Sequence, residues 1–201
     1  MAYPTIDKPY GLKPVNLIGG QVYAGSTRLM AIASGEGTSI FFGAAVTLSG
    51  GYISRDPADS AMQPVGVFMG CTYTDPNSNQ KVFKQYYPGG TVAADIKAYV
   101  VDDPDALFKV AVVSSAAGTT IVMSAVSQTA LGLNAGLIDN AGSTITGDSL
   151  VAISSTLATN AALPVRIVDV VPDTANLLGS YTEVIVKWNF GMHRYYNATG
   201  A

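Results

Sequence analysis

Charged residues are scarce in this sequence. Asp, Glu, Lys and Arg make up 12% of the 201 residues, and the formal net charge is −3; roughly a quarter of an ordinary soluble domain is charged. The 11 basic residues are scattered along the chain, so no basic stripe is present to neutralise phosphates, and direct nucleic-acid binding is not expected. With 48% apolar residues, the chain does not belong to the disordered class. Its neutral exterior fits either a surface covered by partners or a secreted monomer.

Long apolar runs are also missing. A helix that spans a bilayer needs about 18 consecutive apolar residues or more. The longest uncharged stretch covers residues 110–138 and is interrupted by Gly118, Gln128 and Gly132. The first residues, MAYPTIDKPYGLKP, lack the basic-then-apolar pattern of a secretion signal. We therefore expect no membrane association, and synthesis in the cytoplasm.

Cysteine and histidine occur once each, as Cys71 and His193. A lone cysteine forms no internal disulfide, which agrees with cytoplasmic synthesis. Zinc sites usually take several Cys or His ligands, so no metal site is expected within one chain. No nucleophile-elbow sequence is present, so a Ser–His–Asp triad is not expected either. We expect Cys71 to be a buried inert thiol and His193 to lie at the surface near the tail. The protein is expected to be no enzyme and to bind no cofactor.

The densest charge cluster is DDPD, which contains Asp102, Asp103 and Asp105 around Pro104. This spacing does not match a calcium-binding loop, and no second acidic cluster is present to complete a carboxylate pair. An aspartate at the start of a turn accepts a hydrogen bond from the nearby backbone, and proline pre-sets φ for the next position. The sequence therefore favours a turn between two strands. A weak surface cation site and a catalytic carboxylate are the alternatives.

Residues 1–14 contain three prolines and Gly11, so they cannot form a helix interior, and we expect an extended arm. A frayed terminus is the alternative. The arm carries enough apolar surface to lie against another protein, supplied by Tyr3, Ile6, Tyr10 and Leu12.

From residue 15 to about 113, short apolar runs alternate with turn residues. A strand at Ala45–Leu48, a turn at Ser49, Gly50 and Gly51, and a return strand from Tyr52 give the usual hairpin signal. Such spacing is typical of an all-β fold, either a small β-barrel or a sandwich. We expect residues 15–201 to form a single β domain.

Residues 114–160 differ from the rest, because Asp139 and Asp148 are their only charges amid Ser, Thr, Ala and Gly. We expect a loop-rich insertion with weak strands and a short helix within residues 146–158. Regular strands return in LPVRIVDVVP, residues 163–172, and in TEVIVKWNFGMH, residues 182–193.

Three segments in order resemble a known family: FFGAAVTLSGGYISRD, QPVGVFMGCTY and PGGTVAADIKAYVVDDPDALFKV. This order is similar to that of the small β-barrel capsid cement (decoration) proteins of tailed bacteriophages. GLKPVNLIGGQVYAGSTR, the central YVVDDPDALFKV, residues 132–149 and the ending over residues 163–189 resemble virion proteins of marine tailed phages. The resemblance covers nearly the whole chain, but Ala44 departs from it, since the cement barrels usually have Asp at that position.

The resemblance implies a structural protein of the virion, made in the bacterial host cytoplasm and located on the capsid exterior. Its expected partners are the major capsid protein and further copies of itself, as a homo-oligomer such as a trimer. Tyr3, Ile6, Tyr10 and Leu12 of the arm are the expected capsid contacts. The alternative is a receptor- or glycan-binding module on a tail or fibre, for which Tyr86–Tyr87 and Tyr195–Tyr196 are the candidate aromatic platforms.

Overall fold

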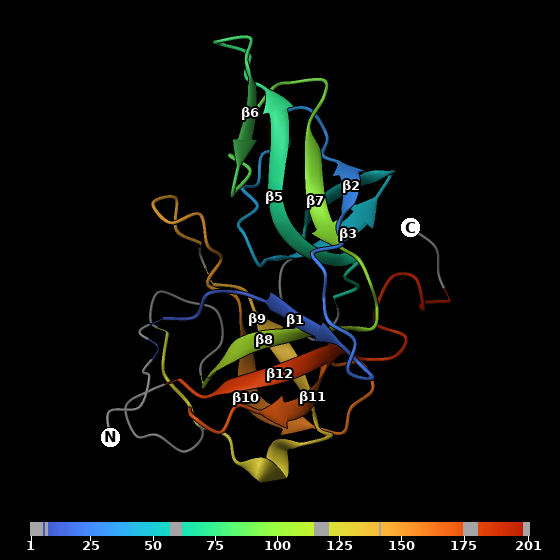
Figure 1. The fold of residues 1–201 in the computed structure, drawn as a ribbon, viewed down its shortest axis with the longest axis vertical. Coiled ribbons are helices and arrows are strands. Elements are labelled where there is room, and N and C mark those ends of the chain that lie inside the picture. The colour runs from blue at the N-terminus through green and yellow to red at the C-terminus, as the bar shows by residue number, and fades with distance from the viewer. Residues whose placement is uncertain are drawn as a thin grey trace.

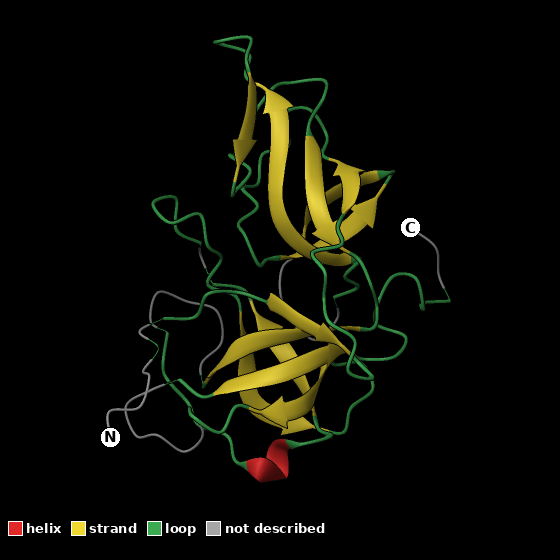
Figure 2. Ribbon diagram, viewed as in Figure 1, coloured by secondary structure: helices red, strands yellow, loops and turns green. Residues whose placement is uncertain are grey.

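The computed structural model describes residues 6, 8–56, 62–114, 121–140, 142–174 and 181–198. Within these residues the structure is almost entirely β, with one short 3-10 turn at Gln128–Ala130 (Figure 2). The strands form two sheets, one above the other in Figure 1. The predicted all-β fold is confirmed.

The first sheet closes into a five-stranded barrel in the order β8-β10-β9-β11-β12 and back to β8. Its strands are β8 (Ala106–Val113), β9 (Asn134–Ile138), β10 (Ala152–Ala158), β11 (Val165–Val170) and β12 (Glu183–Trp188). A sixth strand, β1 (Lys13–Leu17), pairs antiparallel with the first half of β8, whereas β10 pairs with its end. Closure leaves no open edge among the five barrel strands.

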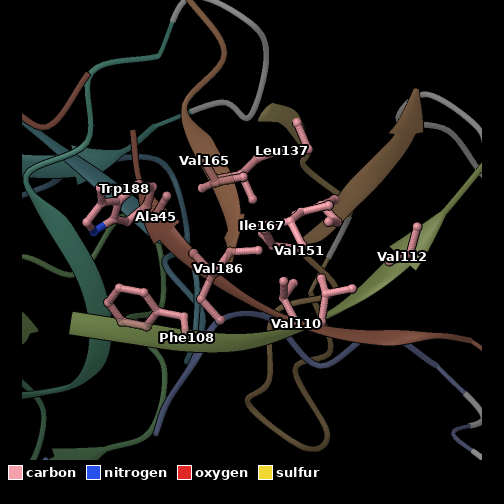
Figure 3. Close-up of a cluster of buried hydrophobic side chains, with 14 of the residues drawn as sticks. Ala45, Phe108, Val110, Val112, Leu137, Val151, Val165, Ile167, Val186 and Trp188 are labelled. Carbon is pink, nitrogen blue, oxygen red and sulfur yellow. The ribbon is translucent and has the colours of Figure 1, made fainter. Parts of the chain in front are cut away.

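Apolar side chains from alternate positions of each strand fill the barrel interior. Successive strand side chains point to opposite faces, so Phe108, Val110 and Val112 of β8 meet Val186 and Trp188 of β12 inside (Figure 3). The rings of Phe108 and Trp188 lie 5.7 Å apart in a tilted arrangement. Burial of these side chains is the main stabilisation of the barrel.

The second sheet has the order β2-β7-β5-β3-β4, and β6 pairs with β5. Its strands are β2 (Arg28–Ala31), β3 (Ala45–Ser49), β4 (Tyr52–Arg55), β5 (Gly66–Thr74), β6 (Lys81–Lys84) and β7 (Lys97–Val101). A parallel bridge between Ile32 and Ile53 brings the two ends of the sheet together. A separate apolar cluster lies inside it, around Phe68, Tyr87 and Val100.

The two sheets also share apolar packing. Ala45, Met62, Val67 and Val101, from the second sheet and its loops, are buried in the same cluster as the barrel interior. Figure 3 shows Ala45 beside Trp188 at one end of the barrel. The second sheet therefore covers one mouth of the barrel. Whether residues 15–201 behave as a single domain stays a prediction.

The predicted hairpin is confirmed, since β3 and β4 pair from Val46–Arg55 to Ser49–Tyr52. Gly50 and Gly51 adopt positive φ in its turn, at 56° and 84°, as this tight connection requires. The short helix expected within residues 146–158 is wrong. Residues 152–158 form β10, because Ile153 pairs with Val112 on one side and with Leu137 on the other. Local propensity is overridden there by tertiary pairing.

At Gly66 the neighbouring strand lies too close for a side chain to fit without displacement. A Cβ at this position would lie 2.3 Å from the Val101 carbonyl oxygen and 2.8 Å from Cγ1 of Val100. We expect Gly66→Ala to lower the free energy of unfolding by about 1–3 kcal/mol, measured by urea denaturation. Gly37→Ala is the matched control, since nothing lies within 4 Å of that Cβ. Equal stability of the two variants would contradict the prediction.

Candidate functional site

The acidic cluster forms a turn, as predicted. Backbone N–H groups of Asp105 and Ala106 donate to the side chain and to the carbonyl of Asp103, at 2.8 and 3.2 Å. The flanking strands β7 and β8 do not pair with each other, because β7 belongs to the second sheet and β8 to the barrel. The turn is therefore the passage of the chain from one sheet to the other.

The aspartates of this turn bind basic and hydroxyl groups of both sheets. Asp102 Oδ2 lies 2.7 Å from Nε of Arg28 on β2 and accepts a 2.8 Å hydrogen bond from the Tyr195 hydroxyl. Asp105 Oδ1 lies 2.6 Å from Nζ of Lys187 on β12. Among the described residues, no group of three or more Cys, His, Asp or Glu side chains is arranged to hold a metal ion. Because β2 pairs with β7 and β12 pairs with β8, each ion pair fixes its end of the turn to the sheet that it adjoins.

The prediction of a surface histidine is wrong. His193 is fully buried, and its ring lies 5.1 Å from that of Tyr195 and 6.4 Å from that of Trp188. Burial lowers the pKa of His193 to about 4, so the imidazole is neutral at pH 7. Its Nδ1 accepts a hydrogen bond from the Tyr195 N–H. The residues after β12 fold back onto the core, which residue type alone did not indicate.

Cys71 is buried, as predicted, and its sulfur lies 3.7 Å from the Tyr86 carbonyl oxygen. Burial raises the pKa of its thiol to about 12, against a weaker lowering by Lys84. A protonated thiol is a poor nucleophile, so the environment of Cys71 gives it no reactive character.

The N-terminal segment is held against the barrel. The Tyr10 hydroxyl donates to the carboxylate of Glu183, which also lies 3.0 Å from Nζ of Lys109. Burial, with the neighbouring Glu183, raises the pKa of Tyr10 well above its usual range. Nζ of Lys13 lies 4.3 Å from the centre of the Tyr10 ring. Residues 10–13 are therefore fixed by charge and hydrogen bonding.

The predicted capsid contacts fall in different environments. Leu12 is fully buried in the barrel cluster, and its N–H donates to the Gly43 carbonyl at 2.9 Å. Its side chain therefore has no exposed surface to offer a partner. Ile6 is half-buried against a small cluster on the outside of β8, and Tyr3 lies outside the described residues. Capsid contact by the arm stays a prediction.

An exposed aromatic surface lies just after β12. Phe190 is 80% exposed and stacks on Tyr196 with ring centres 5.6 Å apart; Tyr195 and Ile18 are each nearly half exposed. Beside Phe190 is a groove of about 200 Å³ whose other lining residues are Ile18, Arg166, Val168, Lys187, Trp188 and Asn189. We call Phe190, Tyr195, Tyr196 and Ile18 the C-terminal aromatic face.

The segment that carries this face is hydrogen-bonded to other parts of the chain. The N–H of Arg194 donates to the Pro64 carbonyl at 2.9 Å, and its guanidinium binds the side chain of Gln63. The Tyr195 hydroxyl is fixed by Asp102, and buried His193 lies between these residues and the core. The aromatic side chains are thus carried on a segment tied to both sheets.

Comparison of the chain with known protein families, curated proteins and solved structures found no match. No helix in the described part of the chain is long and apolar enough to cross a membrane.

Of the two predicted aromatic platforms, one is wrong. Tyr87 is fully buried in the apolar cluster of the second sheet, where its hydroxyl donates to the carbonyl of Glu36. Tyr86 stacks on Phe41 with ring centres 5.3 Å apart. Tyr195 and Tyr196 are exposed, but the most exposed ring beside them, Phe190, was not predicted. The signal was present in the sequence, since Phe190 stands between Asn189 and Gly191 at the end of a strand, where turns expose side chains.

Proposed function

We propose that this protein is a structural virion protein that binds the outside of a phage capsid and cements neighbouring capsid subunits. The observation that carries the proposal is the C-terminal aromatic face, with Phe190 80% exposed on a segment tied to both sheets. Aromatic side chains are enriched among the residues that dominate protein–protein binding energy. The resemblance of the sequence to capsid cement proteins supplies the partner.

The fold supports a mechanical role. The two sheets share buried side chains and are linked by the ion pair between Arg55 of β4 and Asp139, which follows β9 of the barrel. A force applied at the aromatic face is therefore transmitted to both sheets rather than to a single loop. Many copies bound at once on one shell would stabilise it even if each contact is modest.

The proposal is tested by adding purified protein to capsids of the phage that encodes it, after the native copies have been removed. We expect Phe190→Ser to weaken binding roughly tenfold or more, measured as bound copies per particle. Val92→Ser is the matched control, because Val92 is 66% exposed and lies between β6 and β7 of the second sheet rather than after β12. Equal binding by the two variants would exclude the aromatic face as the docking surface.

The arm requires a separate variant. Removing residues 1–14 would also remove Leu12 from the core, so it would confuse binding with folding. Tyr3→Ser tests the arm more cleanly, and reduced capsid occupancy is expected if the predicted arm contact exists.

The second candidate function, receptor or glycan binding on a tail or fibre, is favoured by the same exposed Phe190 and Tyr196 rings, since sugar rings pack on aromatic faces. A glycan array with the soluble protein separates the two functions. Binding to defined glycans that Phe190→Ser abolishes, together with a copy number matching the tail symmetry, would replace the capsid proposal.

A further inference from the structure

A hydrogen-bonded loop presents the most exposed large apolar side chain among the described residues. Ile145, at its tip, is 95% exposed. The loop, residues 143–148, is closed by backbone hydrogen bonds from Ser143 to Asp148 at 3.0 Å and from Gly147 to Ser143 at 2.8 Å. The Ser143 hydroxyl also accepts the N–H groups of Ile145 and Thr146. These hydrogen bonds fix the backbone of the loop with the Ile145 side chain pointing into solvent.

An apolar hollow of about 510 Å³ lies on the second sheet, next to β6. Phe83 forms part of its wall and is 70% exposed. The remaining lining residues are Phe42, Met69, Gly70, Cys71, Lys84, Gln85 and Tyr99. We call this site the Phe83 hollow. It has room for the side chain of an isoleucine together with its neighbours in a loop tip.

The loop and the hollow lie side by side. The N–H of Phe42, a lining residue of the hollow, donates to the Gly147 carbonyl at 2.9 Å. The side-chain amide of Gln85, another lining residue, donates to Asp148 at 2.9 Å. In Figure 1 the loop is the orange one that extends to the left of the two sheets, below β6. Because Ile145 is almost fully exposed, the loop does not fill the hollow of its own chain.

We propose that this face is a self-association surface, in which Ile145 of one copy enters the Phe83 hollow of a second copy and receives that copy's Ile145 in return. When a projection and a hollow lie next to each other on one face, a two-fold axis can place each projection in the other copy's hollow. Both copies then use the same surface patch. A ring such as a trimer would instead need the projection and the hollow on different sides of the molecule.

The charges of this face are complementary under the same two-fold arrangement. Lys84 lines the hollow, and Asp148 ends the loop. Neither forms an ion pair with another described residue of its own chain. When the loop of one copy enters the hollow of the other, Asp148 approaches the partner copy's Lys84, and the contact repeats by symmetry. Complementary charges of this kind fix the register of an interface. The proposal does not depend on capsid binding.

Sedimentation of the full chain over a range of concentrations tests the proposal. We expect a monomer–dimer equilibrium whose dissociation constant rises roughly tenfold or more in Ile145→Lys, because the central apolar anchor is lost. Val22→Lys, which places the same charge at another exposed site, is expected to dimerise as the unchanged protein does. A monomer at all concentrations, a trimer, or a dimer that Ile145→Lys leaves intact would each overturn the proposal.

Two further variants test the pairing itself. Lys84→Glu is expected to weaken the dimer, and the double variant Lys84→Glu with Asp148→Lys is expected to recover it. Mixing Ile145→Cys protein with Phe83→Cys protein under mild oxidation is expected to give a disulfide-linked heterodimer. Buried Cys71 is not expected to compete. Failure of both the charge exchange and the cross-link would show that the two sites do not meet.

Discussion

Replacing Phe108 with alanine is expected to lower the free energy of unfolding by about 3–5 kcal/mol, the usual cost of truncating a buried aromatic side chain. Phe108 is 1% exposed and points into the barrel from β8, where it packs against Trp188. The barrel is closed, so its strands cannot move together easily to fill the space left behind. Trp188, the single tryptophan, provides the fluorescence signal for urea unfolding.

Phe190→Ala is the matched control for this prediction. The same chemical group is removed from a side chain that is 80% exposed, so we expect a change within about 0.5 kcal/mol. A loss below about 1 kcal/mol in Phe108→Ala would show that the barrel interior is not packed as described.

Acidification is expected to destabilise the protein through His193. Its pKa is about 4 when folded and about 6.5 when unfolded, so between these values the unfolded chain binds more protons. The stability that neutral His193 contributes is complete above about pH 6.5, and it is lost as the pH falls toward 4. A difference of this size corresponds to about 3 kcal/mol. Asp102 and Asp103 oppose the shift, and burial outweighs them.

The measurement compares the free energy of unfolding at pH 7 and pH 4.5 in the unchanged protein and in His193→Gln. The variant is expected to lose about 2–3 kcal/mol less between these pH values. Tyr195→Phe, in the same segment, keeps the imidazole and should retain the full pH dependence. If His193→Gln and the unchanged protein lose equal stability on acidification, protonation of His193 is not the cause.

Features set by residues close together in sequence were predicted correctly, whereas features set by contacts between distant segments were not. The hairpin around Gly50 and Gly51, the acidic turn at Asp103 and the burial of Cys71 all depend on neighbouring residues, and all were predicted. The burial of His193 and of Leu12 depends on segments that return to the core from the two ends of the chain. No local pattern encodes such a return, because it is fixed by packing against strands distant in sequence.

The candidate interaction surfaces were harder to predict for the same reason. Tyr86–Tyr87 looked like a platform from its composition, but residue type does not tell which side of a strand faces the core when turns shift the register. Phe190 and Ile145 are isolated apolar residues in polar surroundings, and only the folded loops show that they project outward.

The order of strands along the chain has a consequence for folding during synthesis on the ribosome. The second sheet, apart from its shared core, is built entirely from residues 28–101 and can pair as soon as they have emerged. The barrel instead joins β1 from the start of the chain to β8, and its ring is completed only by β12, Glu183–Trp188. Long-range pairings of this kind form slowly. Until the last strand is synthesised, the side chains of Val67 and Val101 lack part of the barrel packing that buries them. A nascent chain stalled before residue 183 would therefore expose apolar surface, which promotes aggregation.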